Sequence, residues 1–298
     1  MKSLKEALLA GEFAITAEVG PPKGTDAAAF VGKAKLLRSH VNAVNVTDNQ
    51  GAVMRMSSLA ASALLASEGL DVVYQLTCRD RNRLALQSDM LGAHALGIKN
   101  ILALTGDYIT MGDHPQGKAV FDIDSTHLLQ IAEKLNSGTD MMGNPLSEAT
   151  DLFPGAVVTP SANPLEPQLL RFEKKIRAGA RFIQSQAIFN KDGLKKTVSL
   201  AEKHNVKILA GIILLKSAGM ARFLNANIPG VTVPEEMIKK LEKSSNPLER
   251  GIEMAAGQIE TFRPHCHGVH LMAPGAEEKV IDILNTWRVE KVRGFTVE

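Results

Sequence analysis

The chain has 298 residues, of which 45% are hydrophobic and 22% are charged, and its formal net charge is +2. This balance is ordinary for a globular enzyme and argues against a nucleic-acid or membrane-surface partner. No apolar run approaches the roughly 20 residues of a membrane helix. Residues 1–13 have neither signal-peptide nor transit-peptide form, and two cysteines suit a reducing compartment, so we expect a cytoplasmic protein.

Short apolar segments alternate with longer segments of helical period. The apolar segments are predicted strands, at residues 13–18, 43–47, 71–76, 101–104, 156–159, 181–185, 207–213 and 268–272. Strands separated by helices favour a parallel sheet with crossover helices. Eight such units predict an α/β fold, a single (β/α)8 TIM barrel with residues 1–298 as one domain. The alternative, a doubly wound open sheet, is disfavoured because no GxGxxG motif follows the first strand.

The segment from residue 98 to residue 120 carries the clearest functional signal. Its strand stops abruptly at Thr105-Gly106-Asp107. Carboxyl ends of barrel strands are where active sites assemble, and Gly106 would let a cofactor approach the backbone because it has no Cβ. Asp107 would then be a carboxylate at the rim of the barrel. A simple turn is the alternative, but the following Gly112-Asp113-His114-Pro115 favours function.

Polar side chains collect at the predicted strand ends. They are Glu18, Thr47, Gln75, Asp107, Thr159 and Gln186. Glu18 precedes Val19-Gly20-Pro21-Pro22, and the prolines would stiffen the loop after it. Burial among apolar neighbours would favour its protonated form, as a general acid requires. The alternative is a carboxylate paired with a lysine or arginine inside the barrel.

Two further groups of residues have possible ligand-binding roles. His265-Cys266-His267 and His270 look like metal ligands, but strand spacing would put His265 and His267 on one face and Cys266 on the other. No CxxC or HExxH partner exists, so we expect no metal and interpret the histidines as a polar cluster at the bottom of a strand. Arg171, Lys174, Lys175 and Arg177 fall on one helix, where one or two could meet a phosphate.

Several motifs resemble those of the methylenetetrahydrofolate reductase family, in the same order and over nearly the whole chain. They are AEVGPPKG at 17–24, VNVTDNQG at 44–51, YQLTCRD at 74–80, LALTGD at 102–107, VFDID at 120–124 and RFEKKIRAGARFIQSQAIF at 171–189. The resemblance implies that Glu18 is the general acid and Asp107 a second catalytic carboxylate, near the flavin's pyrimidine edge. The implied flavin contacts are Thr47, Gln75, Thr105, Gly106, Asp107, His114, Phe121, Asp122, Thr159 and Lys175. The implied folate contacts are Gln186, Asp107 and Phe223.

The reaction implied by the resemblance is reduction of 5,10-methylenetetrahydrofolate to 5-methyltetrahydrofolate by hydride from flavin N5, with FAD favoured over FMN. The chain departs from the family's common form at Val19-Gly20, Gln75 and Thr105. These departures are similar to an anaerobe and acetogen branch in which a companion redox subunit, rather than NAD(P)H directly, supplies electrons. An oligomer is expected. Two alternatives stay open: a flavin-free pterin-binding methyltransferase barrel, and a non-catalytic barrel subunit of a redox complex.

Overall fold

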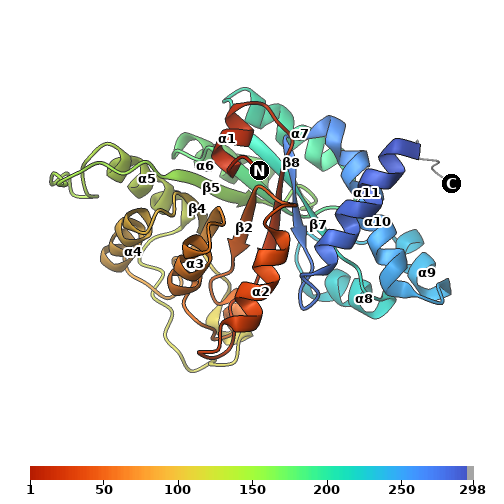
Figure 1. Ribbon diagram of the computed structural model, residues 1–298. Coiled ribbons are helices and arrows are strands. Elements are labelled where there is room, and N and C mark those ends of the chain that lie inside the picture. Colours follow the sequence, from red (N-terminus) through yellow and green to blue (C-terminus); the bar gives the residue numbers. More distant parts are fainter. Residues whose placement is uncertain (294–298) are drawn as a thin grey trace.

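The computed structural model describes residues 1–293 and contains a closed barrel of eight parallel strands in sequence order (Figure 1). The strands are β1 Ala14–Val19, β2 Ala43–Val46, β3 Val72–Thr77, β4 Asn100–Leu104, β5 Phe153–Val158, β6 Phe182–Ala187, β7 Lys207–Ile213 and β8 Gly268–Met272. Thr16 of β1 is paired with Ala43 of β2 on one side and with His270 of β8 on the other, which closes the barrel. The predicted (β/α)8 barrel is confirmed.

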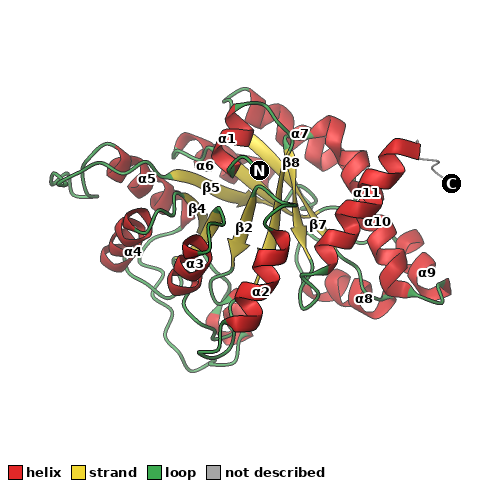
Figure 2. Cartoon of the chain, in the orientation of Figure 1, coloured by secondary structure: helices red, strands yellow, loops and turns green. Residues whose placement is uncertain are grey.

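Helices surround the strands on the outside (Figure 2). They are α1 Leu4–Leu9, α2 Ala28–Leu37, α3 Ser58–Ser67, α4 Arg83–Ala95, α5 Ser125–Asn136, α6 Glu166–Arg177, α7 Lys191–Glu202, α8 Ala218–Asn227, α9 Glu235–Lys243, α10 Pro247–Phe262 and α11 Lys279–Arg293. Three of them, α8 to α10, lie in the connection between β7 and β8. No helix among the described residues is long and apolar enough to cross a membrane.

The main hydrophobic core lies between the strands and the surrounding helices. Outward-facing side chains such as Tyr74 and Ile101 pack there against helix residues such as Leu86 and Leu128. Strands buried on both sides favour apolar residues at successive positions, which is why segments such as 101–104 and 208–213 read as continuous apolar runs. Helix starts follow local signals: the Asp124 carboxylate accepts from the first N–H groups of α5.

The amino-terminal end of the barrel is closed by its own side chains and by α1. Leu4 and Leu8 of α1 join a buried layer in which the rings of Phe153 and Phe182 stack at 5.4 Å between centroids. A Cβ on Gly155 would lie 2.3 Å from the Phe182 ring, so only glycine fits beside it. In Figure 1, α1 lies at one end of the strands and the loop after β4, in yellow, extends beyond the other. The open mouth is therefore the carboxyl end.

Candidate active site

A cavity of about 550 Å³ opens at the carboxyl ends of the strands. It brings together eight of the residues singled out in the sequence: Glu18, Gln75, Thr105, Gly106, Asp107, Thr159, Lys175 and Gln186. In a parallel barrel the carboxyl ends of all strands lie at the same rim, so residues far apart in the sequence are close together there. Leu102, Leu104 and Met272 add an apolar part to this polar wall. We refer to it as the mouth cavity.

Glu18 is a largely enclosed carboxylate of the mouth cavity, with a side chain that is 12% exposed. Its two oxygens accept hydrogen bonds from Gln50 Nε2 at 3.2 Å and Gln75 Nε2 at 3.4 Å. His270 Nε2 lies 3.8 Å from Glu18 Oε2. Within residues 1–293 no lysine or arginine forms an ion pair with Glu18, so the pairing considered as an alternative is not made. The carboxylate is held by neutral amides and stays accessible to a ligand.

Below Glu18 the barrel interior is polar, which the sequence patterns did not indicate. His270 Nδ1 lies 3.0 Å from Thr16 Oγ1, and Gln184 Nε2 donates to that same hydroxyl at 3.2 Å. Gln184 also exchanges two hydrogen bonds with Asn45. These residues sit on β1, β2, β6 and β8. In the sequence, only the alternation of these residues with apolar neighbours could have indicated a polar interior. Because the strands are short, each shows too few alternating positions to be a clear pattern.

A buried aspartate that the sequence analysis also missed fixes the ends of β2 and β3. Asp48 accepts from the Thr77 backbone N–H at 2.9 Å, from the Thr77 hydroxyl at 2.8 Å and from Ser58 Oγ at 3.0 Å. Arg81 contacts the same carboxylate at 2.7 Å and pairs with Asp89 of α4 at 2.9 Å. Buried charges are tolerated when they are paired in this way. The network holds the strand ends that carry Gln75 and Gln50.

The loops after β2, β3 and β4 are joined through Arg79, whose side chain is 2% exposed. Its guanidinium donates to Asp80, to the Asn49 carbonyl at 3.2 Å and to the Asp107 carbonyl at 3.5 Å. Gly106 has φ +100°, and a Cβ there would lie 2.9 Å from the Arg79 Cβ. The backbone conformation and the packing of Arg79 therefore require glycine at position 106, and the predicted approach of a cofactor stays a prediction.

Asp107 lies on the outer part of the rim and is exposed. Its Oδ2 accepts a hydrogen bond from the Gly51 backbone N–H at 3.1 Å. Gln50, the residue before Gly51, donates to Glu18. One short segment, the 3₁₀ turn η1 (Gln50–Ala52), therefore touches both carboxylates.

Lys175 lies where the mouth cavity meets a second cavity of about 450 Å³ beside the start of α5. Its Nζ donates to the Val157 carbonyl at 2.8 Å. Burial lowers the pKa of Lys175 to about 8, an effect that Asp124 partly offsets. Arg171 lines both cavities as well. An anion entering here would restore the full charge on the lysine, so the pair suits a phosphate.

Five other predicted site residues lie outside the mouth cavity. Asp122 pairs with Arg83 of α4 at 2.8 Å, and Phe121 meets the Tyr108 ring edge-on at 6.4 Å. The other three are His114, which is exposed in the loop after β4, Phe223, which is 59% exposed on α8, and Thr47, which is buried behind Gly20 with no partner for its Oγ1.

The histidine and cysteine cluster near β8 does not have the geometry expected from the sequence. His265 belongs to the 3₁₀ turn η3 (Arg263–His265) and the strand begins only at Gly268, so the strand alternation predicted for residues 265–267 is wrong. The Ile208 N–H donates to His267 Nδ1 at 3.1 Å, and burial lowers the pKa of His267. No group of three metal-ligating side chains occurs within the described part of the chain. The preceding turn, not strand pleating, sets the directions of these side chains.

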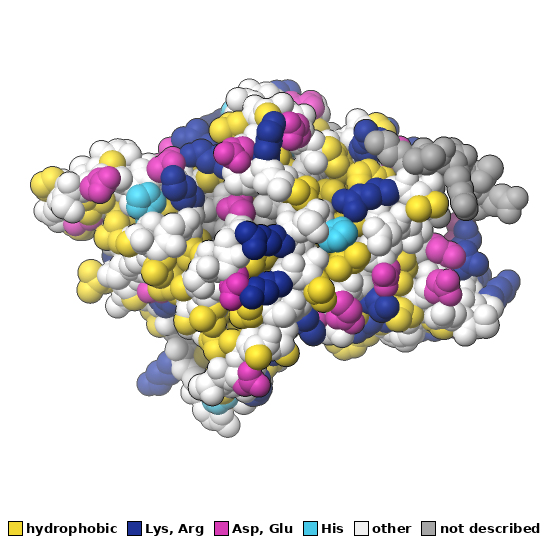
Figure 3. Space-filling view, in the orientation of Figure 1, with side chains coloured by type: hydrophobic (Ala, Val, Ile, Leu, Met, Phe, Trp, Pro, Cys, Tyr) yellow, Lys and Arg dark blue, Asp and Glu magenta, His cyan; other side chains and the backbone are white. Residues whose placement is uncertain are grey.

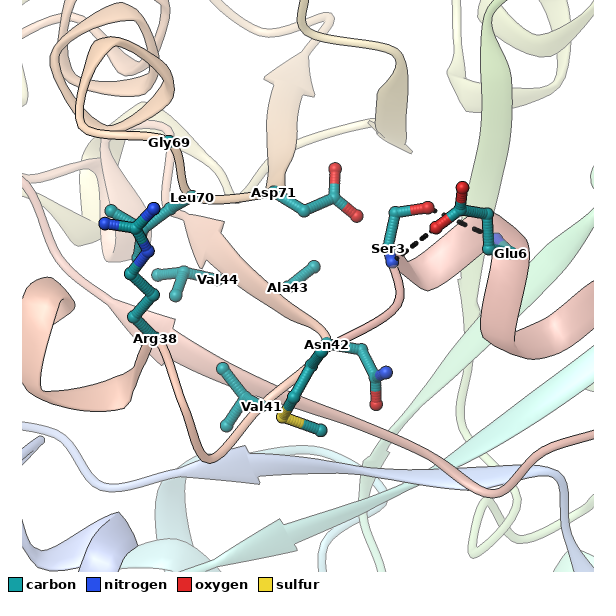
Figure 4. Close-up of a pocket in the computed structure, with 11 residues that line it drawn as sticks. Ser3, Glu6, Arg38, Val41, Asn42, Ala43, Val44, Gly69, Leu70 and Asp71 are labelled. Atoms are coloured by element: carbon teal, nitrogen blue, oxygen red, sulfur yellow. Dashed lines mark hydrogen bonds between the residues drawn. The ribbon is translucent and has the colours of Figure 1, made fainter.

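A separate hollow of about 360 Å³ lies at the amino-terminal end of the barrel (Figure 4). Arg38 and Asp71 stand on different sides of it, and Ser3 and Glu6 bond to each other at its edge. The Asp71 carboxylate accepts from the Leu4 backbone N–H at 2.7 Å, and burial raises its pKa. This hydrogen bond attaches α1 to the barrel, so we assign the hollow a structural role.

On the face shown in Figure 3, acidic and basic side chains are interspersed.

The mouth fits a flavin in the chemistry of its donors. Gln75, Thr105 and Thr159 offer amide and hydroxyl groups, Gly106 lines the same wall, and Lys175 with Arg171 faces a second cavity that could take an anion. The fold and this polar carboxyl-end cavity define a (β/α)8 barrel with its ligand site at the usual catalytic face.

Comparison with known proteins gives the family. A family model described as methylenetetrahydrofolate reductase matches residues 3–288, and the chain belongs to that family. A "probable methylenetetrahydrofolate reductase (NADPH)" of Caenorhabditis elegans is 24% identical over 258 residues, which are 83% of this chain and 37% of that protein. "Methylenetetrahydrofolate reductase 2" of Schizosaccharomyces pombe is 22% identical over 252 residues, 78% of this chain and 38% of that protein. The chain thus spans less than two fifths of these curated relatives.

Solved structures show the fold alone. A Mycobacterium tuberculosis tryptophan synthase structure is 11% identical with a TM-score of 0.51, covering 97% of this chain and 95% of that chain. A 2,3-dimethylmalate lyase is 11% identical with a TM-score of 0.53, covering 98% and 87%. At such identities the likeness extends to the barrel and not to its chemistry.

Proposed function

We propose that this chain reduces 5,10-methylenetetrahydrofolate to 5-methyltetrahydrofolate with a bound flavin. The observation that carries the proposal is the placement of Glu18 in the mouth cavity, held by two neutral amides and paired with no lysine or arginine in the described residues. Family membership supports the substrate. The printed names of the relatives point to the same reaction, although this chain corresponds to only part of their length.

The residues around the cavity divide into cofactor and substrate contacts. Lys175 would hold a flavin phosphate, and Gln75, Thr105, Gly106 and Thr159 would contact the ring system or its ribityl chain. His114, Phe121 and Asp122 lie outside the mouth cavity, and a longer dinucleotide reaches further than FMN, so contacts with these residues would favour FAD. Thr47 is buried behind Gly20 and would support the cofactor's surroundings without touching it. Gln186 and Asp107 would hold the pterin, and Phe223 the outer part of the folate.

The protein's own chemical contribution is proton delivery and orientation. When bound, the flavin would supply hydride from N5 to the one-carbon unit. Glu18 would give its proton to the folate, so that the five-membered ring opens to an iminium that can accept hydride. Asp107, on the outer rim, would orient the pterin and add negative charge near the flavin's pyrimidine edge. Because the same rim would hold both the flavin and the folate, the two would be bound close to the geometry in which they react.

Replacing Glu18 tests the proposal directly. Glu18→Gln keeps the size of the side chain and one oxygen that can accept from either Gln50 or Gln75, but it cannot serve as the acid. Proton donation by a positioned group contributes about 10²–10⁴-fold, so reoxidation of the reduced flavin by methylenetetrahydrofolate should slow by that factor. The measurement is single-turnover stopped flow after reduction with dithionite.

The matched control is Glu12→Gln, just before the other end of β1, where the exposed Glu12 carboxylate pairs with Lys2. This variant should react like the wild type. Both variants should bind flavin and be reduced by dithionite, because neither step needs the Glu18 proton. A Glu18→Gln enzyme that reoxidises within about threefold of the wild-type rate would remove Glu18 from the mechanism.

The flavin-free methyltransferase and the non-catalytic subunit remain the competing functions. A purified protein that is colourless, yet binds folate, would favour the methyltransferase barrel. A flavoprotein whose reduced form does not react with methylenetetrahydrofolate would favour the non-catalytic subunit. Chromatography of the released cofactor separates FAD from FMN.

A further inference from the structure

A histidine on the last strand of the barrel lies directly beneath Glu18. His270 is 4% exposed, and its ring spans the space between Glu18 and the polar interior. Its Nε2 is 3.8 Å from Glu18 Oε2, and its Nδ1 is 3.0 Å from Thr16 Oγ1. The two nitrogens of one ring therefore face two different partners on β1. The roles proposed above for the mouth leave this ring unused.

The contact with Thr16 bears on which nitrogen of His270 carries the proton. A hydroxyl has one hydrogen to donate and can also accept. Gln184 Nε2 donates to Thr16 Oγ1 at 3.2 Å and exchanges two hydrogen bonds with Asn45. We take the single Thr16 hydrogen to be donated to His270 Nδ1, which lies 3.0 Å away. A neutral ring that accepts at Nδ1 carries its hydrogen at Nε2, which points toward Glu18.

The distance to Glu18 suits a bond that forms during the reaction and is absent at rest. At 3.8 Å, Nε2 and Oε2 are too far apart for a hydrogen bond, because such bonds lie near 2.7–3.2 Å. The Glu18 oxygens meanwhile accept hydrogen bonds from Gln50 and Gln75. A shift of less than about 1 Å would bring the carboxylate within reach of the imidazole N–H.

We propose that His270 is a positioning residue for Glu18, a fixed donor that stabilises the carboxylate left when Glu18 gives its proton away. This inference rests on the proposed function, because it assigns His270 a role only through Glu18. Hydrogen bonds to charged acceptors are stronger than those to neutral ones, so the bond strengthens as the proton leaves. Such an interaction is worth more in the transition state than in the resting enzyme and therefore raises the rate.

Two substitutions separate this role from a purely structural one. His270→Gln places an amide N–H near the position of Nε2 and keeps a donor toward Glu18. His270→Asn places its amide near the position of Nδ1, so it keeps a contact with Thr16 but loses the donor. In single-turnover reoxidation by methylenetetrahydrofolate, we expect His270→Asn to be about tenfold slower than wild type and His270→Gln to recover most of that loss. Flavin content and folate affinity should stay unchanged in both.

The same measurement in a Glu18→Gln background tests whether His270 acts through Glu18. We expect His270→Asn to slow the double variant by less than about twofold, because the group it serves is gone. An additive tenfold loss would mean that His270 acts independently and would overturn the proposal. Wild-type rates in both His270 variants would also overturn it. If Glu18→Gln itself reacts normally, the proposed function fails first, and the two failures are thereby distinguished.

A spectroscopic measurement tests the proton position without any turnover. Long-range ¹H–¹⁵N correlation reports the tautomer of each histidine ring, and the signal missing in His270→Asn identifies this one. We expect the Nε2–H form in the resting wild-type protein. A ring protonated at Nδ1 would donate to Thr16 and would present an unprotonated Nε2 to Glu18. That result would contradict the proposal even if the variants fold poorly.

Discussion

At the scale of single residues, the two carboxylates of the mouth are held in different ways. Glu18 is enclosed and accepts from side-chain amides, whereas Asp107 is exposed and accepts from the Gly51 backbone N–H. An enclosed carboxylate exchanges its proton with a ligand in a shielded space, while an exposed one acts mainly through its charge. This difference in environment is consistent with the two roles proposed above, an acid role for Glu18 and an electrostatic role for Asp107.

Asp107→Asn should raise the midpoint potential of the bound flavin. A negative charge near the pyrimidine edge disfavours the anionic reduced flavin, and removing it should raise the potential by about 30 mV, equivalent to about 1.4 kcal/mol for two electrons. Folate binding should weaken, while asparagine can still accept from the Gly51 N–H. Spectroelectrochemical titration measures the shift. The control is Asp151→Asn, at the opposite end of the barrel. Equal potentials in the wild type, Asp107→Asn and Asp151→Asn would show that Asp107 does not tune the flavin and only stabilises its turn.

Lys175 makes the stability of the apoprotein depend on pH. Burial lowers its pKa from the ordinary value of 10.5 to about 8, so the folded state opposes protonation. The unfolded chain binds more protons between pH 8 and 10.5, and the unfolding free energy therefore rises with pH in that window. Below about pH 8 the lysine is protonated in both states, and the folded protein then bears the full free-energy cost of holding that charge in a buried site. Lys175→Met should stabilise the apoprotein at pH 7 by about 1–2 kcal/mol, after allowing for the lost bond to Val157.

Urea titrations at pH 7 and pH 10 check this prediction. The advantage of Lys175→Met over wild type should shrink at pH 10, because the wild-type lysine is then neutral in the folded protein. Lys174→Met changes the exposed neighbour on the same helix and should alter stability by less than about 0.5 kcal/mol. The Lys175 variant should also bind flavin more weakly. A pH-independent difference would show that Lys175 is not held in a buried site.

At the scale of elements, three loops at the carboxyl end are fastened to one another. Asp113, in the loop after β4, contacts Lys23 in the loop after β1 and accepts from the Met54 N–H at 3.0 Å. The Met56 N–H donates to the Pro22 carbonyl at 2.9 Å. Backbone contacts of this kind hold loops that lack a hydrophobic core of their own. The rim of the mouth is thus one connected unit.

Gly112→Ala should loosen this unit while leaving the barrel folded. A Cβ at position 112 would lie 1.8 Å from the Ala52 carbonyl oxygen. Because that oxygen belongs to the backbone, the clash can be relieved only if one of the two loops moves. We expect faster amide exchange at Gly51 and Met54, with exchange of the strand amides unchanged, because loops open locally below the global free energy. Hydrogen-exchange mass spectrometry measures both. Gly24→Ala, in an exposed loop with nothing within 4 Å, should exchange like wild type; equal protection in Gly112→Ala would show that the loops are independent.

At the scale of the whole molecule, the closed barrel has its open mouth at the carboxyl end, so the proposed flavin and its electron source would have to share that end. One relative's printed name includes NADPH, whereas Val19-Gly20 and Thr105 favour a companion redox subunit. We predict that the isolated flavoprotein is reduced by NADH or NADPH far more slowly than the complete system turns over. Anaerobic stopped-flow mixing at saturating NAD(P)H measures that rate. Reduction as fast as turnover would rule out the need for a companion subunit.

The sequence by itself determined the barrel and the candidates at its rim. Alternating apolar strands and amphipathic helices allow few parallel arrangements, and strand ends then share one face whatever their order. For this reason the strand pattern alone was enough to expect Glu18, Asp107 and Gln186 at one rim. The helix starts followed from local caps such as Asp124, which need only neighbouring backbone groups.

Only the tertiary structure decided what surrounds those residues. His270 comes from the last strand and meets Glu18 of the first strand because β8 pairs with β1, a closure that no local pattern encodes. Gln50, which donates to Glu18, stands between the left-handed residues Asn49 and Gly51, a backbone path that the sequence pattern did not indicate. The sequence pattern set the fold through many repeated apolar contacts, whereas single polar contacts at the mouth depend on distances that exist only once the barrel has closed.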